Sequence, residues 1–336
     1  MKKRTKRNLL RISLVVLIVI VGYFFMNTDM VQNTVSTISF GNETNKKEGI
    51  AKVPENYKTL ASHRGTLEKI QYTSSPRVVS VGSEKKAMVY IPYKYDKQKR
   101  YNILYLLHGY GGSEKTFLGS PAAPRPFKRM LDHMIERGDI EPTIVVALTY
   151  TKPAAYYDSM DDMGNEIIED LAPIIESKYH TYAKSTDVKG LQASRDHRAI
   201  GGFSMGGAFT WRALKNNADC FRYFLPSSMP MYYDDHGYDQ GMSLTSAKSI
   251  LEGVQEKAKN KKIYVFAASG SDDFMNQATE EQAKDISNYP EFTFTKKING
   301  KGNVFFHSWK GKSHSYKETF PYFYNGLKKF FGKKSS

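Results

Sequence analysis

The sequence predicts a three-layer α/β domain in which helices cover both faces of a mostly parallel sheet. From about residue 67 onward, short runs of β-branched and aromatic residues alternate with amphipathic stretches of helical length. The run Ile103–Leu107 is apolar on both faces, as a strand covered on both sides must be. Strands that alternate with helices are joined by right-handed crossovers, so we expect them to pair in parallel.

The expected strands are short apolar runs bounded by turn residues, at 87–92, 101–107, 143–150, 198–203, 223–226, 263–268 and 304–309. Amphipathic helices are expected between them, at 126–137, 165–179, 205–217, 246–259 and 276–287, with a last helix at 318–331. The chain shows no repeating period of about 20 to 50 residues, which excludes solenoids and propellers.

The composition is that of one globular domain with appendages. The chain has 336 residues, of which 40% are hydrophobic and 25% charged, which excludes collagen-like and wholly disordered proteins. Its single cysteine, Cys220, excludes an intramolecular disulfide and a multi-thiolate metal site. The net charge is +15, but no helix-turn-helix or RNA-binding signature is present, so we predict no nucleic-acid partner. The oligomeric state stays open.

The N-terminal residues predict a membrane anchor. Six basic and no acidic residues lie within residues 1–11, and the run Ile12–Met26 carries no charge. No small-x-small cleavage site and no lipid-accepting cysteine follow. We therefore expect residues 1–30 to hold a cytoplasmic basic flank and an uncleaved transmembrane helix, with the rest outside the cell; the alternative is a removed secretory signal. Residues 31–62 are expected to form a polar tether of little order, and residues 63–334 the folded domain.

One serine lies at the junction between a predicted strand and a predicted helix. The residues from Gly202 to Gly206 match the pattern G-x-S-x-G, directly after the strand at 198–203. In such a turn the glycines let strand and helix pass closely, and the serine hydroxyl projects above the sheet. Ser204 is therefore the candidate nucleophile.

A serine hydroxyl needs a base to accept its proton and a carboxylate to orient that base. Asp272 and Asp273 follow the strand at 263–268, at the sheet edge where active sites form, and one of them is expected to be the acid. Capping of the next helix is the alternative for either aspartate. Of eight histidines, His314 alone lies in a loop between the last strand and the last helix, which makes it the candidate base. The order serine, acid, histidine is typical of the α/β-hydrolase fold.

Attack of a serine on an ester creates an oxyanion, which requires two backbone N–H donors. Met205, the residue after the serine, is expected to supply one. The other is expected from Tyr110, in the glycine-rich segment His108–Gly112 that follows the central strand. His108 itself is expected to brace this loop by hydrogen bonding.

The segment from Ser194 to Gly207 resembles the nucleophile elbow of bacterial feruloyl esterases over its whole length. Three further segments, residues 108–112, 170–179 and 270–273, support the same likeness. Over about residues 67–331 the chain therefore resembles the esterase D and feruloyl esterase group of carbohydrate esterases, a branch of the α/β-hydrolases related to the mycolyltransferases. In that family's Gly-[Ser/Thr]-x-Asp turn the fourth residue is the acid, which implies Asp273 rather than Asp272.

The resemblance implies a serine esterase that needs no metal or organic cofactor, and the predicted anchor would place it outside the cell. Its substrates would be feruloyl, other cinnamoyl or acetyl esters on plant polysaccharide, cleaved through an acyl-enzyme. The segment at 227–236 departs from the expected pattern because it is rich in methionine and tyrosine. Met229, Met231 and Tyr232 there could form the wall of an aromatic acyl pocket, or the segment could pack only for its own stability.

Three alternatives stay open. A siderophore esterase and a mycolyltransferase-like acyltransferase would use the same fold and the same nucleophile. A carbohydrate- or wall-binding module descended from an esterase would not be an enzyme at all. The presence of all three candidate residues, Ser204, Asp273 and His314, argues against this non-enzymatic alternative.

Overall fold

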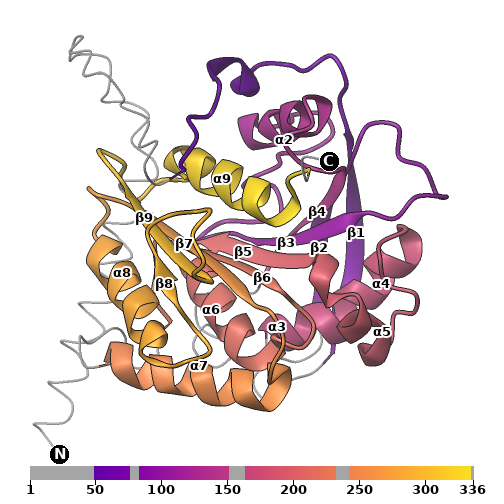
Figure 1. The fold of residues 1–336 in the computed structure, drawn as a ribbon. Coiled ribbons are helices and arrows are strands. Elements are labelled where there is room, and N and C mark those ends of the chain that lie inside the picture. Colours follow the sequence, from indigo (N-terminus) through magenta and orange to yellow (C-terminus); the bar gives the residue numbers. More distant parts are fainter. Residues whose placement is uncertain (1–48, 76–82, 151–162, 232–241, 334–336) are drawn as a thin grey trace, which may run out of the picture. The chain divides into compact units, whose positions relative to one another are not determined.

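The computed structural model describes residues 49–75, 83–150, 163–231 and 242–333. A nine-stranded sheet with the order β1-β2-β4-β3-β5-β6-β7-β9-β8 forms the centre of the domain (Figure 1). The edge strand β1 pairs antiparallel with β2, and β2 pairs antiparallel with β4, whereas every other neighbouring pair is parallel. The predicted α/β fold with a mostly parallel sheet is confirmed.

The strands occupy Thr66–Ser74 (β1), Ser83–Ile91 (β2), Asn102–Leu107 (β3), Thr143–Leu148 (β4), Arg198–Phe203 (β5), Tyr223–Ser227 (β6), Tyr264–Gly270 (β7), Phe294–Thr295 (β8) and Val304–Trp309 (β9). The α-helices occupy Pro126–Glu136 (α2), Met163–Glu166 (α3), Ala172–Lys178 (α4), Val188–Ala193 (α5), Met205–Asn217 (α6), Met242–Ala258 (α7), Asn276–Asp285 (α8) and Phe320–Phe331 (α9). Short 3₁₀ turns lie at Glu55–Lys58, Arg195–His197, Ile286–Asn288 and Tyr316–Thr319, and Ile167–Leu171 is a π-helical stretch.

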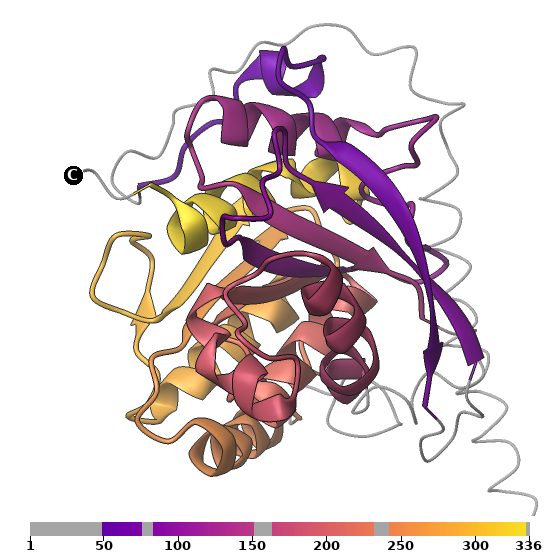
Figure 2. The same ribbon diagram turned by 90° about the vertical axis from the view of Figure 1, so that its right-hand side faces the viewer.

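The strands that were not predicted are those least buried. In β1 alternate side chains such as Ile70 and Tyr72 are buried, while the neighbouring Lys69 and Gln71 are exposed. Figure 2 shows β1 and β2 as a long twisted pair at the sheet edge. A strand with one face in water carries few consecutive apolar residues, so a search for apolar runs misses it. The two-residue β8 and the one-and-a-half-turn α5 were also missed.

Alternate side chains of the strands enter two cores, one on each face of the sheet. In β3, Ile103, Tyr105 and Leu107 enter the first core, and Leu104 and Leu106 enter the second. Helices α3 to α8 contribute to the first core, and α2 and α9 to the second (Figure 1). Burial on both faces explains why this strand is apolar at every one of these positions.

Residues 49–62 belong to the folded domain, so the prediction that they form part of the tether is wrong. Tyr57 is buried, its hydroxyl donates to Asp139 Oδ2 at 2.7 Å, and its ring stacks on His133. The backbone of Ala51 exchanges two hydrogen bonds with the side chain of Asn325 in α9. One aromatic anchor and these backbone contacts hold the segment, and a polar composition reveals neither.

The remaining part of the expected tether and the apolar run Ile12–Met26 lie outside the described residues. The part of the chain that the structure does describe contains no helix long and apolar enough to cross a bilayer. The transmembrane helix is therefore a prediction that rests on the sequence alone.

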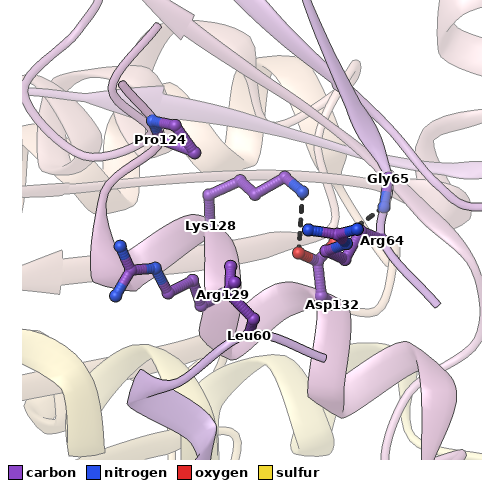
Figure 3. Close-up of a pocket in the computed structure, with 7 residues that line it drawn as sticks. All are labelled: Leu60, Arg64, Gly65, Pro124, Lys128, Arg129 and Asp132. Carbon is purple, nitrogen blue, oxygen red and sulfur yellow. Dashed lines mark hydrogen bonds and ion pairs between the residues drawn. The ribbon is translucent and has the colours of Figure 1, made fainter. Parts of the chain in front are cut away.

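Helix α2 is tied to the start of β1 by a buried carboxylate. Asp132 accepts hydrogen bonds from the N–H of Gly65, from the Tyr90 hydroxyl and from Lys128 Nζ, at 2.8, 3.0 and 2.7 Å. Figure 3 shows Lys128, Asp132 and Gly65 in a surface pocket that is also lined by Leu60, Arg64, Pro124 and Arg129. Burial raises the pKa of Asp132, and the hydrogen bonds from Lys128 and Gly65 oppose that rise.

The amino end of β5 is held by a buried ion pair. Arg198 donates from Nε and Nη2 to the two carboxylate oxygens of Glu176, at 2.7 and 2.8 Å. Its Nη1 donates to the carbonyls of Leu191 and Cys220. Because both charged side chains are fully enclosed and multiply hydrogen-bonded, the pair fixes the start of the strand that ends directly before Ser204.

Candidate active site

The predicted serine, aspartate and histidine meet at the carboxyl edge of the sheet. Ser204 follows β5, Asp273 lies in the loop after β7, and His314 lies in the loop after β9. His314 Nε2 lies 2.9 Å from Ser204 Oγ, and His314 Nδ1 lies 2.8 Å from Asp273 Oδ1. The three side chains thus form an unbroken hydrogen-bonded chain from hydroxyl to imidazole to carboxylate.

Ser204 occupies a strained turn between β5 and α6. Its φ of 56° and ψ of −123° lie in a region that residues other than glycine rarely adopt. A Cβ at Gly202 would lie 2.5 Å from the backbone of Gly206, and one at Gly206 would lie 2.3 Å from the carbonyl oxygen of Leu107. The two glycines of the motif are therefore required by the close approach of strand and helix.

The loops after β7 and β9 are hydrogen-bonded to each other. The two strands pair through Gly270 and Trp309, and the N–H of Ser271 donates to the Trp309 carbonyl at 2.8 Å. The N–H of Asp272 donates to the Lys312 carbonyl at 3.0 Å. Gly270 has no room for a side chain, because a Cβ there would lie 1.9 Å from the Lys312 carbonyl oxygen. The backbone therefore sets the spacing between acid and base.

The two neighbouring aspartates have different surroundings. The Asp273 side chain is fully buried, and its Oδ1 also accepts a hydrogen bond from the N–H of Met275 at 2.8 Å. Asp272 is exposed, and its carboxylate accepts a hydrogen bond from Ser271 Oγ. Of the pair it is Asp273 that contacts the histidine, as the resemblance implied.

The glycine-rich segment after β3 lies directly over the serine. A Cβ at Gly109 would lie 3.1 Å from the Cβ of Ser204. His108 Nδ1 donates to the Gly109 carbonyl at 2.7 Å, and its ring stacks on Tyr150 at 3.8 Å. Burial lowers the pKa of His108 to about 4, so this histidine is neutral at neutral pH and holds the loop as expected.

The predicted oxyanion donors lie on the two segments that converge here. Tyr110 is the residue after Gly109 in the glycine-rich loop, and Met205 begins α6 directly after Ser204. Both backbone N–H groups therefore belong to residues adjacent to the close contact between loop and serine. Two such donors are what an oxyanion at the attacked carbonyl requires.

Tyr316 is a residue of this site that the sequence analysis missed. Its hydroxyl accepts a hydrogen bond from the N–H of Gly109 at 2.5 Å, and its ring packs against those of Phe203 and Phe117. Burial raises the pKa of Tyr316, so the hydroxyl stays protonated at neutral pH. Tyr316 lies two residues after His314, but no sequence pattern distinguishes it among the 23 tyrosines of the chain.

The three residues predicted to line an acyl pocket differ in their surroundings. Met231 is buried in the core at 2% exposure. Met229 is half-buried against the same core, and its carbonyl accepts a hydrogen bond from Trp211 Nε1. Tyr232 lies outside the described residues. Met229 therefore stays a candidate, whereas Met231 is nearly enclosed by its neighbours.

A serine, a histidine and an aspartate hydrogen-bonded at the carboxyl edge of a mostly parallel sheet define an α/β-hydrolase with the geometry of a catalytic triad. Residues 79–322 match the model of the Esterase family, and the chain belongs to this family. The family predicted from the elbow and its supporting segments is thereby confirmed.

Two relatives within this similarity are xylan-degrading enzymes by name. The chain is 35% identical over 279 residues to Endo-1,4-beta-xylanase Y of Acetivibrio thermocellus, covering 83% of this chain and 24% of that protein. It is 26% identical to an Endo-1,4-beta-xylanase/feruloyl esterase of Xylanibacter ruminicola, covering 62% of this chain and 28% of that one. The chain thus spans about a quarter of the length of these curated relatives.

A solved structure resembles this chain, and the match covers nearly the full length of that solved structure. It is the feruloyl esterase module from Clostridium thermocellum, a serine-to-alanine mutant complexed with sinapinate. The identity is 32%, the TM-score is 0.73, and the match covers 85% of this chain and 95% of the module. The similarity therefore extends over nearly the whole of that feruloyl esterase module.

The low pKa of His108 predicts that part of the folding stability is lost in mild acid. In the unfolded chain this histidine takes up a proton near pH 6.5, whereas in the fold it stays neutral until about pH 4. The unfolded state then binds more protons, so the free energy of unfolding should fall by up to about 3 kcal/mol between these pH values. Denaturant unfolding at several pH values should show a shallower fall for His108→Gln than for the native chain. His180→Gln, which alters an exposed histidine, should keep the native slope; an equal slope in all three would contradict the prediction.

The bond between Tyr316 and Gly109 predicts a defect in turnover when the hydroxyl is removed. Tyr316→Phe should lower kcat about tenfold with little change in KM, because the loop that carries the oxyanion donor loses one hydrogen bond. Tyr264→Phe is the matched control, since its hydroxyl bonds the Ile298 carbonyl at the amino end of β7. Steady-state kinetics on one chromogenic ester would test both variants. A native kcat in Tyr316→Phe would be incompatible with this role.

Proposed function

We propose that this chain is a serine esterase that hydrolyses feruloyl and related cinnamoyl esters carried by plant polysaccharide. The observation that carries the proposal is the hydrogen-bonded chain from Ser204 through His314 to Asp273, with distances of 2.9 and 2.8 Å. The acyl class is supported by the sinapinate complex of the similar module, and the polysaccharide by the xylanase names of the relatives.

In the proposed acylation step, Ser204 Oγ attacks the ester carbonyl while His314 Nε2 accepts the hydroxyl proton. Asp273 holds the imidazole in the required tautomer and stabilises its charged form. The backbone N–H groups of Tyr110 and Met205 would stabilise the oxyanion. Collapse of the tetrahedral intermediate breaks the bond to the alcohol oxygen, which receives the proton from His314. The acyl group is left as an ester of Ser204.

In the proposed deacylation step, His314 takes a proton from water, whose oxygen attacks the acyl carbon. The second tetrahedral intermediate collapses to release the carboxylic acid, and the proton returns to Ser204 Oγ. Each proton that His314 accepts is donated again within the same half-reaction, so the enzyme ends the cycle in its starting state. We keep Met229 as the candidate wall for the aromatic acyl group.

Substitution of the nucleophile and of the acid should lower hydrolysis to different extents. Ser204→Ala should lower kcat by about 10⁶, because the nucleophile is absent. Asp273→Asn should lower it by about 10⁴, because the imidazole is then held in the wrong tautomer. The matched control is Asp272→Asn, an identical change one residue away on an exposed side chain, which should stay within about twofold of the native rate. Hydrolysis of methyl ferulate measures all three variants, and equal losses in the two asparagine variants would refute the assigned roles.

The acyl preference needs a direct comparison of substrates. The native chain should cleave methyl ferulate and methyl sinapate with higher kcat/KM than a matched acetyl ester. Preference for a catechol-type siderophore lactone, with no turnover of feruloyl esters, would instead favour the siderophore esterase. Transfer of the acyl group to an added sugar alcohol in preference to water would favour the acyltransferase.

We also propose that residues 1–30 anchor the enzyme in the cell membrane with the catalytic domain outside. Support comes from the six basic residues before the uncharged run Ile12–Met26 and from the absence of a cleavage motif after it. The full chain should sediment with membranes and resist salt extraction, whereas a chain that begins at residue 31 should stay in the supernatant. N-terminal sequencing of the membrane-bound protein should find residues from this segment. A mature N-terminus beyond Met26 would establish a removed signal instead.

A further inference from the structure

A large apolar side chain lies in solvent beside the histidine of the site. Phe274 is 59% exposed, and its ring centroid lies 4.4 Å from that of His314, with 37° between the ring planes. Isolated exposed apolar residues are common on protein surfaces and need no function. Phe274 differs from them because it touches the group that must exchange protons with the substrate.

The backbone around Phe274 is held in a tight turn. The N–H of Asp273 donates to the Gly270 carbonyl at 3.1 Å, and the N–H of Asn276 donates to the Asp273 carbonyl at 2.9 Å. Asp273 Oδ1 also accepts from the N–H of Met275. Because these bonds fix the residues before and after Phe274, its ring is presented beside the histidine by a rigid segment.

A second phenylalanine already packs against the histidine from the core. The ring of Phe203 lies 4.7 Å from that of His314, and Phe203 is 2% exposed. A buried contact of this kind is enough to support an imidazole from the protein interior. The exposed surface of Phe274 is therefore free to contact a bound molecule.

The chemistry fixes which part of the substrate lies near Phe274. In the proposed mechanism His314 Nε2 donates a proton to the leaving oxygen, which must then lie about 3 Å from it. The sugar bonded to that oxygen is consequently next to the imidazole, where the ring of Phe274 lies. The acyl group is bonded to Ser204 and extends from the carbonyl on its other side, away from the leaving alcohol.

We infer that Phe274 is a specificity-determining residue that binds the sugar of the leaving alcohol, the inference resting on the proposed esterase function. A sugar ring presents a face of C–H groups with slight positive charge, and the face of an aromatic ring is slightly negative. Stacking of the two faces removes apolar surface from water on both partners. A substrate with a small alcohol such as methanol has no such face to bind.

The test compares one acyl group on two alcohols. Phe274→Ala should lower kcat/KM for a feruloylated arabinoxylan oligosaccharide by about five- to tenfold, mainly through KM, because an aromatic contact of this strength is lost. The same variant should stay within about twofold of the native chain on methyl ferulate. Phe274→Trp should restore activity on the oligosaccharide. Val188→Ala is the control, because Val188 is an exposed apolar residue in α5, which precedes β5 at the opposite edge of the sheet.

Each result has a definite consequence. Selective loss on the oligosaccharide with rescue by tryptophan supports the inference. An equal fall on both substrates would mean that Phe274 acts only by holding His314, and no change on either would mean that the ring binds nothing; both results overturn the inference while leaving the esterase function intact. If the native chain cleaves neither methyl ferulate nor the feruloylated oligosaccharide, the proposed function is refuted, and the inference that rests on it is refuted as well.

Discussion

The site depends on one backbone constraint, the left-handed turn at Ser204. A non-glycine residue in this region costs of the order of 1–3 kcal/mol, so the surroundings must hold it there. The N–H of Ser204 is bonded to the Ser227 carbonyl on β6, and Ser227 Oγ donates to the carbonyl of Gly202. The adjacent parallel strand therefore holds the turn from one side, and the close packing of Gly206 on Leu107 holds it from the other. Strain at the nucleophile is thus balanced by ordinary sheet contacts.

The parallel sheet also brings together residues that lie far apart in the sequence. Parallel strands all end at one edge, and the segments after β3, β5, β7 and β9 supply the oxyanion loop, nucleophile, acid and base. The register of β7 with β9 places Gly270 opposite Trp309, and the following backbone bonds bring Asp273 to His314. The distance between acid and base is therefore set mainly by main-chain pairing, and the side chains supply the carboxylate and the imidazole.

How far sequence predicted this arrangement depends on the physical origin of each feature. The nucleophile, acid and base were predictable because each follows an apolar strand, and a strand buried on both faces is recognisable as a continuous run of apolar residues. Edge strand β1 and the ordered segment around Tyr57 were not, since half-exposed or polar residues carry no such mark. Tyr316 and Phe274 were missed for another reason. Their importance comes from contacts with Gly109 and His314, which exist only once the loops are folded.

The segment after β9 places two residues of the site, His314 and Tyr316, within three positions of each other. His314 contacts the nucleophile, and Tyr316 bonds the N–H of Gly109 in the loop that covers it. A displacement of this loop would withdraw the base and loosen the oxyanion loop in the same movement. Its position is held by the backbone bonds to the acid loop and by the ion pair of Lys312 with Glu318 at 2.8 Å. Because the base and the loop that carries Tyr110 share this support, a displacement of the segment after β9 would impair proton transfer and one of the two oxyanion donors together, while Met205 stays held at the start of α6.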